Sequence, residues 1–281
     1  MSDLRRKIEQ LYRDGLRYEA AGDSYLAVKV YKKIIRLDKL WTQAYARLGL
    51  IYKKRAEWKP ALYYCKKAVA LDPAQAEIWW ALGIAAVALK KKGIAKSVWG
   101  KFGPDHYPSN PTCIRLRYQK RVEILWVRPL DPARGEIINI PDPSSDRRYR
   151  DIILFDREVI GHNVVGCRRV PIFDELSLFK RSGYHTFSCL LHTQEEKYIQ
   201  ALERLSLEHG LGFEIWSNST RQIIPTTQGA SPEYFSRDFL LPANARECIA
   251  AFAAYELTDV QTVLESWRVV CFQGYSELRR Y

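Results

Sequence analysis

The chain has 281 residues, of which 47% are hydrophobic and 27% are charged, and its formal net charge is +12. This length predicts two domains of about 100–200 residues each, and the apolar fraction is sufficient for a sizeable core in both. No apolar run reaches the ~18 residues of a membrane span, and the charged N-terminal residues lack the apolar core of a secretion signal, so we expect neither.

The positive charge is concentrated in the first part of the chain. Residues 1–103 contain 22 Lys and Arg against 9 Asp and Glu, whereas residues 104–281 contain 22 against 23. A field of this sign attracts acidic partners, which are nucleic acids, acidic protein surfaces or anionic membranes.

Small residues recur every 34 residues between positions 8 and 103. Glycine does so at 15, 49 and 83, and alanine at 27, 61 and 95. Where two antiparallel helices cross closely, small residues are needed at the contact, so a fixed period of this length predicts a stack of helical hairpins.

The residues around these positions resemble the tetratricopeptide repeat (TPR) family, whose pattern is W-x2-L-G-x2-Y, then A-x3-F, then P. The third repeat reads Trp79-x2-Leu82-Gly83, then Ala95-x3-Trp99. The second reads Tyr45-x2-Leu48-Gly49-x2-Tyr52, Ala61-x3-Cys65 and Pro73, and the first reads Leu11-x2-Asp14-Gly15-x2-Tyr18 and Ala27-x3-Tyr31. Lys39 replaces the closing proline of the first repeat, and Cys65 and Ala86 replace larger residues. The resemblance covers about a third of the chain and implies an all-α solenoid of three hairpins.

In chain order, we expect helices at 3–20 and 24–37, 41–55 and 58–71, and 75–91 and 93–102. Asp23 or Ser24 is suited to cap the second helix. The domain 1–103 should end at a proline-rich linker, residues 104–112, which contains Pro104, Pro108 and Pro111.

Residues 113–281 are predicted to form an α+β domain, for which the sequence indicates no family. The part from 113 to 180 reads as mostly β, with strands at 122–128 and 137–140, a loop at 141–146, and a hairpin at 152–160 that turns at Asp156-Arg157.

The part from 181 to 281 suggests a β-α-β-β-α-β order. The strands are 184–191, 211–216, 221–224 and 267–272, and the helices are 194–209 and 244–257. That order is typical of ferredoxin-like domains. A further strand at Phe239–Leu241 would change the count.

The TPR resemblance implies that the first helix of each hairpin lines a concave groove. By register, the groove residues are Tyr12, Leu16, Glu19, Ala46, Leu50, Lys53, Lys54, Trp80, Ile84 and Val87. Leu16, Leu50 and Ile84 form an apolar stripe that suits a docked peptide or helix. The alternative is that the chain's own ends cover it. Some family members clamp a C-terminal carboxylate with two groove asparagines; Leu16 and Arg47 stand there instead, so we do not expect that ligand.

A second set of residues, the lysine ridge, follows the second helices. It comprises Lys32, Lys33, Lys66, Lys67 and Lys101, of which Lys33, Lys67 and Lys101 are 34 residues apart. Such a row could follow a phosphate backbone. It is also what an ordinary solvated helix face looks like, because lysine is a good helix former.

Enzyme signatures are weak. There is no P-loop, G-x-S-x-G, H-E-x-x-H or G-x-G-x-x-G motif. His185 and His192, which flank Cys189 on one predicted strand, would suit a Cys/His nucleophile. Glu195, Glu196 and Lys197 with Asp142 or Asp156 would suit a metal nuclease. Each set also reads as structural. We therefore predict no catalytic residues, metal or cofactor.

The sequence as a whole favours an adaptor or scaffold that binds a protein or peptide in the groove and prefers acidic partners. The alternatives are a sequence-indifferent nucleic-acid-binding protein that uses the lysine ridge, and an enzyme in residues 113–281. Six cysteines without metal-ligand spacing indicate a reducing compartment, so we expect a cytoplasmic protein. The sequence makes no prediction of oligomeric state.

Overall fold

The structure is a computed structural model, and it describes residues 3–102, 110–119, 121–165, 167–217, 223–225 and 246–281. The chain divides into two units, residues 1–107 and 108–281. Most of the predicted linker lies outside the described residues.

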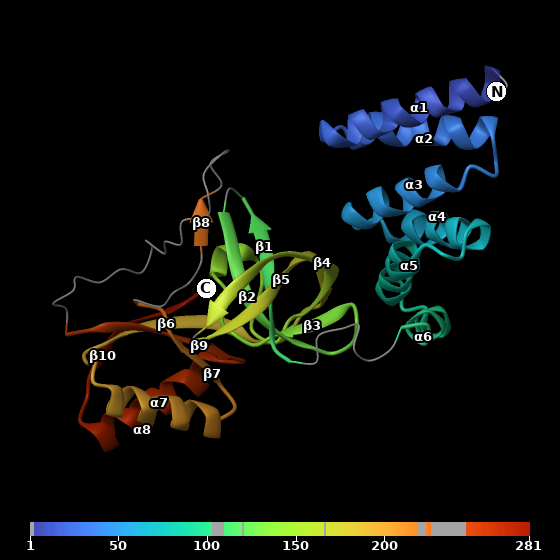
Figure 1. Cartoon of the computed structure of the whole chain (residues 1–281). Helices are drawn as coiled ribbons and strands as arrows, with labels where there is room; N and C mark the ends of the chain where they lie inside the picture. The colour runs from blue at the N-terminus through green and yellow to red at the C-terminus, as the bar shows by residue number, and fades with distance from the viewer. Residues whose placement is uncertain (1–2, 103–109, 120, 166, 218–222, 226–245) are drawn as a thin grey trace. The chain divides into compact units, whose positions relative to one another are not determined.

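Within its described residues, 3–102, the first unit contains six α-helices that form three hairpins (Figure 1). The pairs are α1 Asp3–Ala20 with α2 Ser24–Leu37, α3 Thr42–Lys54 with α4 Trp58–Leu71, and α5 Ala76–Ala88 with α6 Lys92–Trp99. The Asp23 side chain caps α2 by accepting a hydrogen bond from the backbone N–H of Leu26 at 2.9 Å. All six predicted helices are confirmed, and their ends differ from the expected ones by at most three residues.

The three glycines lie at equivalent helix crossings. A Cβ atom at Gly15 would lie 2.6 Å from Cε1 of Tyr31, and one at Gly49 would lie 2.5 Å from Sγ of Cys65. At Gly83 it would overlap the ring of Trp99. In every hairpin the residue four positions after the buried alanine therefore packs directly on the glycine. This is the packing that the TPR resemblance implied, and the N-terminal unit is TPR-like.

The second unit begins with a sheet of six strands. They are β1 Thr112–Tyr118, β2 Arg121–Pro129, β3 Arg134–Ile137, β4 Ile152–Val165, β5 Arg168–Lys180 and β8 Ile223–Pro225, in the order β1-β5-β4-β3-β2-β8. Because β1 also pairs with β2, the first five strands close on themselves as a small barrel. The barrel core is apolar and includes Ile114, Val127, Ile153 and Phe155. A mostly β segment was predicted here, and the structure confirms it.

Two details of that prediction were wrong. Residues 152–160 do not form a hairpin but belong to the single strand β4, in which the pairing moves from Phe155↔Glu175 to Val159↔Phe173. Between these two pairs β4 advances by four residues and β5 by only two, so β4 has a bulge at the position of the predicted turn. The strand expected at 137–140 ends at Ile137, because the Asn139 side chain, rather than its backbone, accepts the hydrogen bond from the N–H of Trp126 at 2.9 Å.

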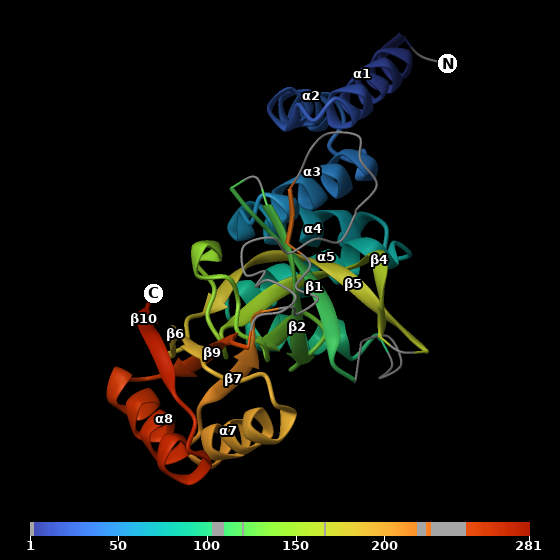
Figure 2. The ribbon, with the colours of Figure 1, turned by 90° about the vertical axis from the view of Figure 1, so that its left-hand side faces the viewer.

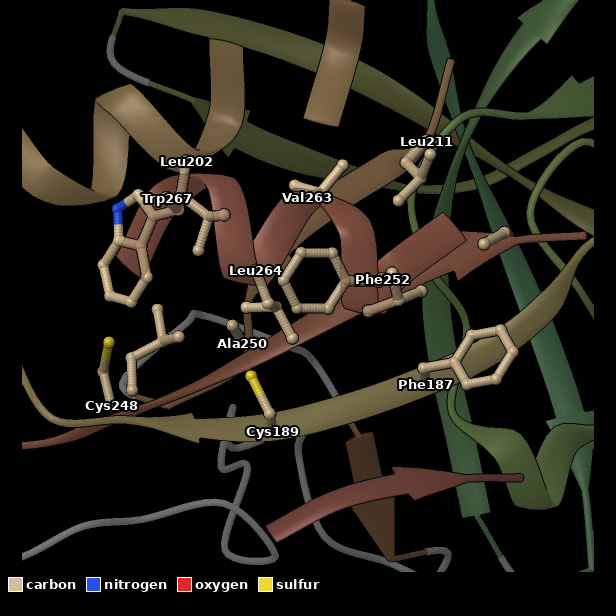
Figure 3. Close-up of a cluster of buried hydrophobic side chains, with 13 residues drawn as sticks. Phe187, Cys189, Leu202, Leu211, Cys248, Ala250, Phe252, Val263, Leu264 and Trp267 are labelled. Carbon is tan, nitrogen blue, oxygen red and sulfur yellow. The ribbon is translucent and has the colours of Figure 1, made fainter. Parts of the chain in front are cut away.

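The second sheet of this unit has four antiparallel strands in the order β10-β6-β9-β7. They are β6 His185–Leu191, β7 Gly212–Ile215, β9 Cys248–Ala254 and β10 Tyr275–Arg280. Figure 2 shows helices α7 Glu196–Glu208 and α8 Leu257–Cys271 on one face of this sheet. The core between them contains Phe187, Phe252, Leu202, Leu264 and Trp267 (Figure 3).

Several predicted elements of this region were misplaced. The helix expected at 244–257 is the strand β9, and the strand expected at 267–272 lies mostly in α8. The strand expected at 221–224 is represented by β8, which pairs with β2 of the other sheet. The strand considered at Phe239–Leu241 lies outside the described residues.

The two sheets are connected by apolar and polar contacts. Trp216, Ala251 and Ala253 of the second sheet region cluster with Ile140, whose backbone N–H donates to the Glu214 carboxylate at 3.1 Å. None of the helices in the described part of the chain combines the length and the apolar character that a membrane span needs.

Candidate docking surface of the helical unit

The predicted groove residues differ widely in exposure. Leu16 and Lys54 are exposed, and Tyr12 and Glu19 are half-buried. The other six are buried, namely Ala46, Leu50, Lys53, Trp80, Ile84 and Val87. Along the predicted apolar stripe the exposed fraction falls from 38% at Leu16 to 7% at Leu50 and 0% at Ile84. Only the part of the predicted groove on the first two hairpins is therefore open in this structure.

The burial of Trp80 has a visible cause. The ring of Trp80 lies 5.1 Å from that of Trp99 and 4.9 Å from that of Phe102, centroid to centroid. An aromatic cluster at the end of the helical unit therefore covers a residue that the repeat register assigned to a ligand.

An ion pair forms at Arg47, one of the two positions to which the TPR resemblance would assign a carboxylate clamp. Arg47 of α3 donates from Nε to Oε1 of Glu19 at 2.8 Å and from Nη2 to Oε2. The Tyr31 hydroxyl of α2 donates to the same carboxylate at 2.6 Å. Glu19 thus binds the cation that a ligand carboxylate would need, and it joins three helices of two hairpins.

The Tyr31 phenol should make stability depend on alkaline pH. Burial and the hydrogen bond to Glu19 raise the pKa of Tyr31 above its ordinary value of about 10. Below that pH the phenol is neutral in both the folded and unfolded states. Above it the unfolded chain loses the proton while the folded chain keeps it, so the free energy of unfolding falls as pH rises.

Above about pH 10, the free energy of unfolding should fall less steeply with pH in Tyr31→Phe than in the natural chain. The difference in slope should be up to ~1.4 kcal/mol per pH unit. Urea unfolding at several pH values on both sides of that point measures the slope. Equal slopes for the variant and the natural chain would contradict the assignment.

All five residues of the lysine ridge are exposed, namely Lys32, Lys33, Lys66, Lys67 and Lys101. Among the residues that the structure describes, no carboxylate forms an ion pair with any of the five. Two of them contact aromatic faces: Nζ of Lys101 lies 4.4 Å from the Trp79 ring centroid, and Nζ of Lys32 lies 5.7 Å from that of Tyr52. The five lysines therefore place positive charge on the surface of the unit that no carboxylate of the described residues neutralises by a direct ion pair.

The proposed Cys/His pair is not arranged for catalysis. Cys189 is buried in the core of the second sheet (Figure 3), and this burial raises the pKa of its thiol to about 12. Burial and the nearby Arg280 and Arg148 lower the pKa of His185. A protonated, inaccessible thiol is not a nucleophile at neutral pH.

The proposed nuclease residues are not brought together either. Glu195, Glu196 and Lys197 are exposed at the start of α7, where Lys197 pairs with Glu195 at 2.8 Å. Asp142 and Asp156 are buried in the barrel region. Across the described ranges, no three His, Cys, Asp or Glu residues lie close enough to hold a metal ion.

Comparisons of the chain with known proteins found similar solved structures only. No protein-family model matches the chain, and no curated protein matches it. A crystal structure of MamA is 22% identical, with a TM-score of 0.30, over 34% of this chain and 54% of that one. The TPR2B domain of yeast Sti1, solved as a complex with pHsp70, is 21% identical, with a TM-score of 0.30, over 34% of this chain and 83% of the domain.

A mutant of the O-GlcNAc transferase of Thermobaculum terrenum is 19% identical, with a TM-score of 0.31, over 38% of this chain and 22% of the transferase. The chain thus spans about half the length of the MamA structure and about a fifth of the transferase. The TPR-like character of the first unit follows from the 34-residue register and the three glycine crossings.

Proposed function

We propose that this protein is an adaptor whose TPR-like unit docks an acidic segment of another protein. The observation that carries the proposal is the row of exposed, unpaired lysines that recurs with the same 34-residue period as the helix crossings. A rigid repeat stack presents such charges at fixed positions, and this favours recognition of an extended or helical partner.

Within the predicted groove, the proposed contacts are Leu16, Lys54 and the half-buried Tyr12. An exposed leucine and an exposed lysine on the same predicted groove suit an acidic peptide with apolar side chains. The buried groove residues would then support this surface rather than contact the ligand.

The last ~100 residues are proposed to be ferredoxin-like, on the support of the strand order β10-β6-β9-β7 and of α7 and α8 on one face. A cytoplasmic location is proposed because all six cysteines are free thiols.

Nucleic acid is the second candidate partner, and the exposure of Lys33, Lys67 and Lys101 favours it. Binding through these lysines alone would be indifferent to sequence and would fall steeply with salt. The two candidates therefore differ in what they require besides charge, because a peptide must also contribute apolar contacts.

The test is selection of random dodecapeptides displayed on phage against the full chain, followed by affinity measurements on the enriched peptides and on a single-stranded DNA 30-mer. We expect enriched peptides to combine acidic and apolar residues. Reversal of Lys33, Lys67 and Lys101 to Glu should weaken their binding by about tenfold or more, since each exposed charge contact contributes roughly 0.2–1 kcal/mol.

A matched control reverses three exposed cations of the second unit, Lys180, Arg204 and Arg246, and it should leave peptide affinity within about twofold. Failure to enrich any peptide, together with tight DNA binding that the ridge reversal abolishes, would replace the adaptor by the nucleic-acid alternative.

A further inference from the structure

A pocket of about 390 Å³ opens between α4, α5 and α6, on the surface formed by the second helices of hairpins two and three. We call it the inter-repeat pocket. Its apolar lining comes from Val69 of α4, Trp79 and Leu82 of α5, and Ile94 and Val98 of α6. Leu82 and Val98 are almost completely buried, so they form a fixed floor.

Small residues in α6 are the reason that the pocket exists. Gly93 and Ser97 line it, and a Cβ atom added at Gly93 would meet nothing within 4 Å. One repeat earlier, the equivalent positions carry Lys59 and Tyr63. The third hairpin therefore has two small residues at positions where the second hairpin has two long side chains, and this leaves space for the pocket.

Two cations of the lysine ridge lie next to this apolar pocket. Lys66 lines the pocket, and Nζ of Lys101 lies 4.4 Å from the ring centroid of Trp79. Among the described residues, no aspartate or glutamate lines the inter-repeat pocket. The ammonium group over Trp79 also occupies one face of a ring on which a nucleotide base could otherwise stack, which favours a peptide over a nucleic acid.

We propose that the inter-repeat pocket receives one aromatic or large aliphatic side chain from the acidic partner segment, with neighbouring carboxylates of that segment paired to Lys66 and Lys101. This proposal rests on the proposed function and names its site. The volume lies near the lower end for ligand pockets, which suits one anchoring side chain better than a larger ligand. Burial of such an anchor should improve affinity by about 10- to 100-fold over alanine.

The probes are fluorescein-labelled heptapeptides with three acidic residues on each side of a central phenylalanine or a central alanine, and their binding to the full chain is followed by fluorescence anisotropy. We expect the phenylalanine peptide to bind 10- to 100-fold more tightly than the alanine peptide. Gly93→Phe, which fills the pocket mouth, should abolish this preference, whereas Gly93→Ala should preserve it. Lys66→Glu should weaken both peptides by up to about fivefold, and Lys33→Glu, which carries the same charge change on α2, should weaken them less.

The outcomes separate this site from the adaptor function. Equal affinity for the two peptides, an unchanged preference in Gly93→Phe, or no binding of the phenylalanine peptide at about 1 mM would overturn the pocket assignment. If Leu16→Glu abolishes the preference and Gly93→Phe does not, the groove is the docking site, and the adaptor function stands without the pocket. If neither heptapeptide nor any displayed peptide binds, the adaptor function fails as well.

Discussion

We expect Gly83→Ala to lower the free energy of unfolding of the helical unit by about 1–3 kcal/mol, even though alanine is the better helix former. A methyl group at Gly83 would overlap the Trp99 ring. That ring is held by Trp80 at 5.1 Å and cannot move without disturbing the aromatic cluster at the end of the unit. The close crossing, rather than backbone freedom, is thus the reason that glycine is needed at this position.

Gly93→Ala is the matched control, because it makes the same chemical change in the neighbouring helix where nothing lies within 4 Å. It should be neutral or stabilise the unit by up to about 1 kcal/mol. Urea unfolding followed by far-UV circular dichroism measures both variants. Similar shifts of the helical transition in both would show that Gly83 is not at a tight crossing.

The second large effect is expected from Glu19→Gln. The Glu19 carboxylate accepts hydrogen bonds from Arg47 and Tyr31, and only 17% of its side chain is exposed. The neutral amide leaves the Arg47 guanidinium half-buried without its counter-charge, so we expect a loss of about 1–3 kcal/mol in the free energy of unfolding.

Glu9→Gln tests whether this loss is specific to the buried pair. Glu9 lies on the same helix and pairs with Arg5 at 3.3 Å, but the Arg5 side chain is 66% exposed. Such a surface pair contributes roughly 0–1 kcal/mol, so its loss should be small. Equal unfolding curves for Glu19→Gln and Glu9→Gln would mean that the network with Arg47 does not connect the hairpins.

The helical unit could be predicted from the sequence because its determinants are local and occur three times. Gly15, Gly49 and Gly83 identify each crossing, and the helices pack mainly against neighbours in the chain. The exposure of the groove was less predictable. Trp80 is covered by Trp99 and Phe102, and the repeat pattern does not specify what packs beyond the last hairpin.

The second unit resisted prediction for two physical reasons. Strand β9 has both faces buried, with Ala250 and Phe252 toward the helices and Ala251 and Ala253 toward Trp216, so its continuous apolar run lacks the alternation of a strand. In α8, the exposed pair Val269-Val270 is β-branched, and such residues favour the prediction of a strand.

Closure of the barrel depends on contacts that are distant in the chain. Strand β1 pairs in parallel with β5, and Arg115 binds Asp174 through two hydrogen bonds of 2.6 and 2.7 Å across 59 positions. The hydrophobic pattern of a single strand does not indicate which distant strand it pairs with. The inter-repeat pocket was not predicted for a different reason, which is that it depends on the absence of large side chains at Gly93 and Ser97. Only a comparison with Lys59 and Tyr63, 34 residues earlier, could have indicated it.

The most direct test of a docking role for the TPR-like unit is hydrogen–deuterium exchange of the full chain, measured with and without the tightest peptide from the display selection. We predict slower exchange in α4, α5 and α6 when the peptide is bound, and unchanged exchange in residues 110–217 and 246–281. Slower exchange confined to the second unit, with the helices unaffected, would contradict the assignment of partner binding to the helical repeats.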